Sequence, residues 1–266
     1  AFLVPQADHS LALLAQAGIA AFRTPESCAD GLAAFLDWSV PASMEPFFLD
    51  LGPAREALVA SKGAILDELE AGAVFSALGI AQAPAQVVNE ASGPCPVEFP
   101  VVAKVLSRDV PHKMDVGGVE LDIADEHMLA QAIRAIRGST GIVDAPILVQ
   151  RMERGIFEAL VGYIDNPETG PIVLFGFGGA FAEAYRKVSM RLAPIDVATA
   201  RRMITEVPGL TILLQREGDV AALADAIVAV SHLAFIDAPK IREAEINPLI
   251  VKVDGVVAVD GLIVLA

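Results

Sequence analysis

The sequence predicts a mixed α+β protein whose main part has two lobes. Hydrophobic residues make up 54% of the 266 residues and charged residues 20%, a composition typical of a well-packed globular chain. Strand and helix patterns alternate through residues 64–266. Residues 41–63, which begin with a Pro-rich stretch, are interpreted as a linker between this part and a shorter N-terminal pattern.

The first forty residues have the pattern of an α/β fragment. A short helical stripe ends at Gly18, and residues 19–22 have the composition of a strand. Thr24-Pro25 then caps and starts a helix that we expect to reach about Trp38. Because one such unit cannot bury its own sheet, it either docks on the main part or pairs with strands outside this chain.

The main part begins with a predicted helix that ends at Gly79. The expected strands lie at residues 85–88, 99–106, 118–123, 147–150, 157–164, 172–175, 189–192, 241–246, 249–253 and 256–259. The expected helices lie at residues 126–137, 197–207 and 220–235, the last behind Asp219 as N-cap. We place the two lobes at about residues 90–152 and 153–266.

Charge and cysteine content narrow the function classes. A net charge of −15 repels a phosphate backbone and anionic lipid, so we expect no nucleic-acid or membrane partner. Cys28 and Cys95 have no paired spacing, which indicates a reducing compartment, and we expect a cytoplasmic protein. Residues 1–4 lack a basic region and an initiator Met, so we expect the middle of a longer chain rather than a signal peptide.

The strongest local signal is the C-terminal hairpin. Its turn is predicted at Asp254-Gly255, so that the two flanking valines pair. Continued along the strands, this register places Asp260 opposite Leu249. Asn247 is then its diagonal neighbour, roughly 7–8 Å away at the backbone.

Polar side chains gather on one face of this hairpin. Glu245, Asn247 and Asp260 share the face in a segment otherwise rich in Val, Ile and Leu. A carboxylate and an amide oxygen suit magnesium that also keeps waters and phosphate oxygens. The alternative is a surface hairpin with its polar residues in solvent. We favour the metal site, with Asn247 and Asp260 as ligands.

Lys104 is a lone cation in the apolar strand 99–106. Its side chain points either to solvent or into a polar cleft, where a compact ammonium suits a phosphate oxygen. Taken alone, the solvent-facing alternative is the commoner one.

Residues 112–119 (HKMDVGGV) lie between two predicted strands. Gly117 and Gly118 let the backbone approach phosphates closely, and His112 and Lys113 add cationic donors. The segment is neither a P-loop nor a dinucleotide fingerprint, so a plain glycine turn remains the alternative.

Residues 176–183 (GFGGAFAE) come directly after an apolar strand. Three glycines in four residues open a sharp turn, and Glu183 is suited to orient a lysine or ribose hydroxyls. Tight packing between a strand and a helix explains the glycines equally well.

Taken in order, these segments resemble the ATP-grasp domain of ADP-forming (NDP-forming) acyl-CoA synthetases, which include ADP-forming acetate–CoA ligase and are relatives of the succinyl-CoA synthetase β subunit. The resemblance covers residues 64–266, and residues 1–40 look like the tail of a flavodoxin-like CoA-ligase domain. It is carried by the Lys104 strand, residues 112–119, VQRM at 149–152, GIFE at 155–158, DNP at 165–167 with GP at 170–171, the glycine-rich loop with Glu183, RLAP at 191–194, and EINPL at 245–249 with VD at 259–260.

The resemblance implies an ATP-grasp fold that binds Mg-ATP between its lobes, with adenine against the backbone near residues 150–152. The implied nucleotide-binding residues are Lys104, Lys113, Gly117, Gly118, Gln150, Met152, Glu158 and Glu183, and the implied ligands of Mg²⁺ are Asn247 and Asp260. The metal neutralises charge on the transferring phosphoryl group.

The resemblance also implies an acid–thiol ligase. In this family a histidine carries the phosphoryl group to a carboxylic acid, and the acyl phosphate then reacts with CoA. His112 lies where some members are thought to use a second phosphohistidine, so His112 and Lys104 are the implied catalytic residues; alternatively, His112 only hydrogen-bonds phosphate. We expect CoA-binding and CoA-ligase domains in the same longer chain or in a partner subunit, a small carboxylic acid as substrate, and a homo- or hetero-oligomer.

Three segments depart from the family pattern, one of which is the stretch before Phe99, which is short and rich in Gly and Pro where a helix is expected. Lys187 stands where the family usually has Asp, and residues 213–218 lack the family's Gly-x-Arg-Gly form. These departures support a rival hypothesis, a nucleotide-binding regulatory module without catalysis, for instance within a protein acyltransferase. A carboxylate–amine ligase on the same fold is a third hypothesis.

Overall fold

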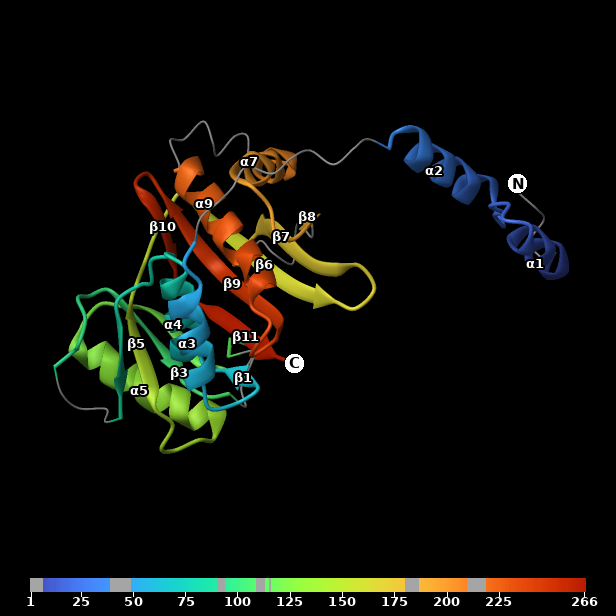
Figure 1. The fold of residues 1–266 in the computed structure, drawn as a ribbon. Helices are drawn as coiled ribbons and strands as arrows, with labels where there is room; N and C mark the ends of the chain where they lie inside the picture. The colour runs from blue at the N-terminus through green and yellow to red at the C-terminus, as the bar shows by residue number, and fades with distance from the viewer. Residues whose placement is uncertain are drawn as a thin grey trace. The chain divides into compact units, whose positions relative to one another are not determined.

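The computed structural model describes residues 7–38, 49–89, 94–108, 113–114, 116–179, 187–209 and 219–266. His112, Glu183 and residues 213–218 therefore lie outside the described residues. The chain divides into two compact units, residues 1–44 and residues 45–266 (Figure 1). Among the described residues, no helix combines the length and the apolar character that crossing a membrane requires.

The N-terminal unit contains the helices α1 (Asp8–Gln16) and α2 (Pro25–Leu36). The Thr24 side chain accepts a hydrogen bond from the Ser27 N–H, and Pro25 opens the helix as predicted. The predicted strand at residues 19–22 is wrong, because these residues form no strand. Phe22 makes only an isolated β-bridge, which is too short to count as a strand.

The predicted linker at residues 41–63 is also corrected in part. Residues Gly52–Ala60 form helix α3, which packs against α4 (Glu68–Ala77). The Ala54 and Leu58 side chains on α3 are 0% and 1% exposed and belong to the main hydrophobic core. Residues 52–60 are therefore part of the folded unit, because their i, i+4 apolar pair is covered by α4.

The larger lobe is built on a seven-stranded sheet with the order β1-β11-β9-β6-β7-β8 and β10 paired to β9. All of its strand pairs are antiparallel. The strands are β1 (Ile65–Leu66), β6 (Phe157–Asn166), β7 (Gly170–Phe177), β8 (Val188–Leu192), β9 (Ile241–Lys252), β10 (Gly255–Ala258) and β11 (Gly261–Leu265).

Helices α4, α7 (Val197–Glu206) and α9 (Val220–Ser231) pack against this sheet, and Figure 1 shows α9 lying across it. A short 3₁₀ helix, η1 (His232–Phe235), continues α9. Asp219 caps α9 as predicted, since its carboxylate accepts a hydrogen bond from the Ala222 N–H. These contacts form one continuous apolar core.

The smaller lobe has four antiparallel strands in the order β2-β5-β3-β4. The strands are β2 (Ala85–Val88), β3 (Val101–Val105), β4 (Val119–Ile123) and β5 (Ile147–Arg151). Helix α5 (Glu126–Thr140) covers this sheet and closes a second, separate core. Although β1 and α4 precede this lobe in the sequence, they belong to the larger one, where the α4 residue Phe75 lies against Gly261 of β11.

Candidate functional site

The C-terminal hairpin differs from the prediction in its register. Gly255 pairs with Lys252 and Ala258 pairs with Leu249, so the turn is one residue earlier than expected. Ala258 and Leu249 are 1% and 0% exposed, whereas the predicted register opposes the half-buried Asp260 to the buried Leu249. Burial of the apolar pair therefore explains the register better than the turn sequence does.

The observed register brings Asn247 and Asp260 directly opposite each other rather than diagonally. The Asn247 N–H donates to the Asp260 carbonyl at 3.2 Å. The Asn247 amide oxygen accepts from the Gly179 N–H at 2.8 Å, and its amide nitrogen donates to Glu245 at 3.1 Å. One Asp260 carboxylate oxygen accepts from the Gly261 N–H at 2.9 Å.

This donor set fits a hard cation such as Mg²⁺. The Asn247 amide oxygen comes from β9 and the Asp260 carboxylate from the two residues between β10 and β11, and both groups are oxygen donors. Burial, the leading cause, and the neighbouring Glu68 carboxylate raise the pKa of Asp260 above its ordinary value, although Lys104 and Lys113 act in the opposite direction. A carboxylate in such surroundings gains from a further positive charge.

Lys104 on β3 does not point to solvent. Its residue is 6% exposed, and its ammonium donates to the Glu68 carboxylate at 2.6 Å and to the Val259 carbonyl at 2.5 Å. Glu68 opens α4 and Val259 directly precedes Asp260, so both partners belong to the larger lobe. Lys104 therefore joins the two lobes beside the hairpin.

Lys113 reaches the same carboxylate. Its ammonium donates to the second oxygen of Glu68 at 2.5 Å. Burial lowers the pKa of Lys113, but the negative charges of Glu68 and Asp260 outweigh this effect and raise it overall. For Glu68 the balance is reversed: burial raises its pKa, and the charges of Lys104 and Lys113 lower it below the ordinary value. Lys113 and Glu68 are therefore both charged near neutral pH.

Gly117 and Gly118 allow the tight turn that positions Lys113. The Gly118 N–H donates to the Lys113 carbonyl at 2.7 Å, and the Gly117 N–H donates to Met114 at 3.2 Å. Gly117 has a φ of 66°, and a Cβ on Gly118 would lie 2.9 Å from the Lys113 carbonyl oxygen and from Val105. A tight glycine turn is thus present, and it holds Lys113 beside Lys104.

The second glycine-rich segment approaches the hairpin from β7. A Cβ on Gly179 would lie 1.8 Å from a Glu158 carboxylate oxygen, and a Cβ on Gly178 would lie 2.4 Å from the Ala159 carbonyl oxygen. Close packing against the backbone therefore requires glycine at position 178, and the positive φ of 57° favours glycine at position 179. The Gly179 N–H also contacts Asn247, so the loop begins beside the hairpin's polar face.

Gln150 and Met152 lie at the end of β5, where the smaller lobe connects to β6. Gln150 is 6% exposed and pairs with Val102 on β3. The Met152 N–H donates to the Pro100 carbonyl at 2.9 Å. The hydrogen bonds described for these residues connect them to the smaller lobe and not to the Lys104 cluster.

Sequence reasoning missed Glu68 and Glu153, whose buried side chains join the lobes in the described part of the chain. The Glu153 side chain is 4% exposed; it accepts hydrogen bonds from Arg151 on β5, at 2.8 and 2.5 Å, and from Lys252 on β9. Glu68 lies among three acids in four residues at a helix start, a pattern that ordinary helix capping also produces.

Two antiparallel sheets joined by a buried lysine–carboxylate cluster define a two-lobed α+β fold. The chain belongs to the ATP-grasp domain family, whose sequence model matches residues 57–265. The predicted fold and the predicted relationship to ADP-forming acyl-CoA synthetases are therefore confirmed.

Two relatives show the extent of the match. The chain is 37% identical over 178 residues to subunit beta of acetate–CoA ligase [ADP-forming] I from Pyrococcus furiosus, across 64% of this chain and 76% of that subunit. It is 36% identical over 204 residues to acetate–CoA ligase [ADP-forming] I from Archaeoglobus fulgidus, across 72% of this chain. The chain spans only 30% of that second relative.

A solved structure has the same fold. It is the dinucleotide-forming acetyl-coenzyme A synthetase 1 of Ca. Korarchaeum cryptofilum in complex with coenzyme A and Mg-AMPPCP. Its TM-score is 0.69 at 32% identity, over 80% of this chain and all of that chain.

Proposed function

We propose that this chain is the Mg-ATP-binding part of an ADP-forming acyl-CoA synthetase, an acid–thiol ligase. The observation that carries the proposal is the meeting of Lys104 and Lys113 with Asp260 and Asn247 where the two lobes join. Cations suited to phosphate oxygens and oxygen ligands suited to Mg²⁺ are the two requirements for binding a nucleoside triphosphate.

Each remaining residue has a proposed role. Lys104 and Lys113 bind phosphate oxygens, and the Gly117-Gly118 turn closes over them. The backbone near residues 150–152 receives adenine, while Glu158 and Glu183 orient hydroxyl or lysine groups. Asn247 and Asp260 hold Mg²⁺, which neutralises charge on the phosphoryl group.

His112 is proposed as the phosphoryl acceptor because it directly precedes Lys113. An imidazole nitrogen attacks the γ-phosphorus and the bond to the ADP oxygen breaks. The carboxylate substrate then takes the phosphoryl group, and the CoA thiol displaces phosphate from the acyl phosphate. A role for His112 limited to hydrogen bonding is tested by searching for an acid-labile phosphate on a His112→Ala variant and the wild type.

The proposal extends to the rest of the enzyme. CoA and a small carboxylic acid bind to CoA-binding and CoA-ligase domains, in the same longer chain or in a partner subunit. Residues 1–40 are the tail of such a domain, residues 64–266 are the ATP-grasp domain, and the assembly is a cytoplasmic oligomer. In support, a 4-hydroxybutyrate–CoA ligase [ADP-forming] from Nitrosopumilus maritimus aligns with 91% of this chain at 26% identity.

Calorimetric titration of ATP into the chain, with and without magnesium, tests the proposal. Wild type is expected to bind ATP in a magnesium-dependent way, and Asp260→Asn is expected to lose about tenfold or more in affinity because a metal ligand is removed. Asp254→Asn, an equal charge change at the exposed hairpin turn, is the matched control and leaves affinity unchanged.

Absence of magnesium-dependent binding in folded wild type contradicts the proposal. If binding is intact but the assembled full-length enzyme forms no acyl-CoA, the regulatory-module hypothesis is favoured instead. Lys187, exposed just before β8, is then the first residue to restore to Asp.

A further inference from the structure

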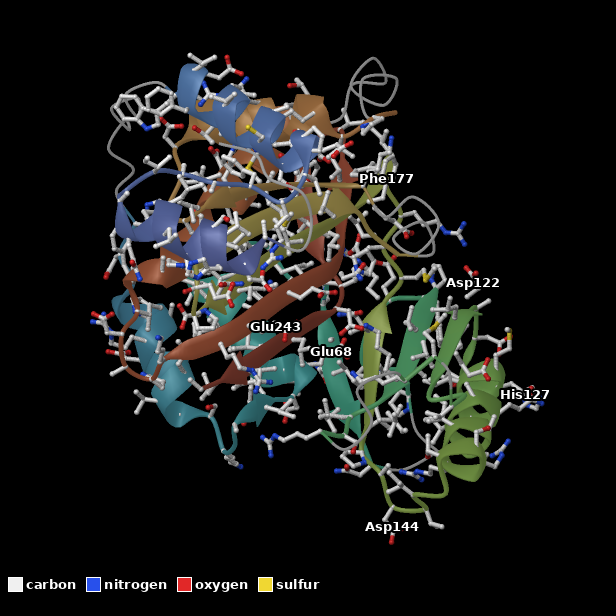
Figure 2. All side chains as sticks on the ribbon, turned by 90° about the vertical axis from the view of Figure 1, so that its right-hand side faces the viewer. Glu68, Asp122, His127, Asp144, Phe177 and Glu243 are labelled. Atoms are coloured by element: carbon white, nitrogen blue, oxygen red, sulfur yellow. The ribbon has the colours of Figure 1, made fainter. Side chains whose placement is uncertain are left out.

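Both lysines proposed to bind phosphate are already paired with one carboxylate. Glu68 uses one oxygen for Lys104, at 2.6 Å, and the other for Lys113, at 2.5 Å. The Glu68 side chain is 5% exposed, and those of Lys104 and Lys113 are 7% and 12% exposed. Figure 2 shows Glu68 where the strands of the two sheets approach each other.

The remaining donors of these ammonium groups are limited. Each ammonium has three N–H donors. Lys104 uses one on Glu68 and one on the Val259 carbonyl, and Lys113 uses one on Glu68. A phosphate oxygen that bridges the two ammonium groups therefore competes with Glu68, which already bridges them.

Electrostatics explains why a carboxylate lies between Lys104 and Lys113. Two buried ammonium groups side by side repel each other and lose hydration, so without an anion they are strongly unfavourable. Asp260 supplies one negative charge nearby, and Glu68 supplies the second. Two carboxylates thus face the two ammonium groups in this cluster.

We propose that Glu68 is a resident counter-anion, which holds the place on Lys104 and Lys113 that phosphate oxygens take when nucleotide binds. The inference rests on the proposed function and deepens it, because it assigns Glu68 the role of limiting nucleotide affinity. Binding exchanges one anion for another, so part of the phosphate–lysine attraction is offset by the loss of the Glu68 pairs. Nucleotide release is favoured for the same reason, since Glu68 returns to the lysines as phosphate leaves.

The two carboxylates of the cluster should therefore respond in opposite ways. Glu68→Gln keeps the side-chain shape but removes the competing charge, so the Kd for Mg-ATP is expected to fall by about tenfold. Damage to the structure alone weakens binding, so a gain in affinity identifies competition. Asp260→Asn, in contrast, weakens binding.

The test is calorimetric titration of the full chain with Mg-ATP and, separately, with Mg-tripolyphosphate, which has phosphates and no adenine. The affinity gain of Glu68→Gln is expected with both ligands. Glu70→Gln is the matched control, since Glu70 lies on the same helix but pairs with Arg108 instead of the two lysines. Its Kd should equal that of wild type.

Each outcome decides between the proposals. If wild type binds Mg-ATP and Glu68→Gln binds equally or more weakly, the counter-anion role is overturned while the proposed function stands. If folded wild type does not bind, the proposed function and this inference both fail. Should Glu68→Gln not fold, Glu68→Asp is used, because its shorter side chain cannot reach both ammonium groups and tighter binding is again expected.

Discussion

Glu68 and Glu153 are both buried glutamates that pair with two cations and join the two lobes, yet their surroundings differ. Glu68 faces Lys104 and Lys113, whose side chains are 7% and 12% exposed. Glu153 faces Arg151 and Lys252, whose side chains are 40% and 25% exposed. The cations of the first cluster are enclosed, whereas those of the second reach solvent.

This difference suits the Glu68 cluster to exchange one anion for another, whereas the Glu153 cluster, called the Glu153 clamp below, is suited to a structural role. Arg151 ends β5 and Lys252 ends β9, so Glu153 fixes the segment that connects the two sheets. Water already solvates the Arg151 and Lys252 side chains, so these cations gain little from binding a further anion. Enclosed lysines beside Asp260, in contrast, gain strongly from an anionic ligand.

The largest expected contrast lies in catalysis. In the full-length enzyme, Lys104→Met is expected to lower the rate of acyl-CoA formation by about 100-fold or more, because a charge that stabilises the transferring phosphoryl group is lost. Lys252→Met removes an equal charge from the Glu153 clamp and should change the rate by about threefold at most. Steady-state assays of ADP release measure both.

Equal losses in the two variants contradict this contrast. They assign both clusters to the same step or to stability alone. Circular dichroism of each variant at the assay temperature separates unfolding from a catalytic effect.

Local patterns explain how much of the fold the sequence predicts. Strands such as residues 172–175 and the Asp219-capped helix result from spacing and capping, which act within a few residues. Helix α3 had a usable signal, because Pro53 stands in its first turn and Ala54 and Leu58 are spaced i, i+4. The Pro-rich sequence around helix α3 led to the interpretation of this segment as a linker.

Tertiary contacts explain what the sequence does not predict. The hairpin register depends on burying Ala258 against Leu249, which the turn sequence does not specify. Glu68 and Lys104 are 36 positions apart and meet only when α4 packs on the larger sheet. A helix-start glutamate carries no local sign of such a partner.

The next contrast is thermodynamic. In the nucleotide-free chain, Glu68→Gln is expected to lower the unfolding free energy by about 3 kcal/mol, because two buried ammonium groups lose their shared anion. Glu153→Gln is expected to lower it by about 1 kcal/mol, since its cations are partly hydrated. Urea denaturation followed by far-UV circular dichroism gives both values. A larger loss of unfolding free energy for Glu153→Gln than for Glu68→Gln contradicts this comparison.

The smallest contrast is the pH dependence of the Glu153 clamp. Burial raises the pKa of Glu153, but hydrogen bonds and charges from Lys252 and Arg151 outweigh burial and hold the pKa below its ordinary value of 4.5. Because the folded state binds the proton less readily than the unfolded state, the stabilisation is complete above the unfolded pKa. It is lost as pH falls through the folded pKa.

The stability difference between wild type and Glu153→Gln is therefore expected to be constant from about pH 7 to about pH 5 and to shrink below about pH 4. Urea titrations across this range, in buffers of equal ionic strength, measure it. A difference that persists unchanged at about pH 3 means that the glutamate acts through its shape and packing rather than its charge. In that case the two clusters differ in kind, with ionic pairing confined to the cluster around Glu68.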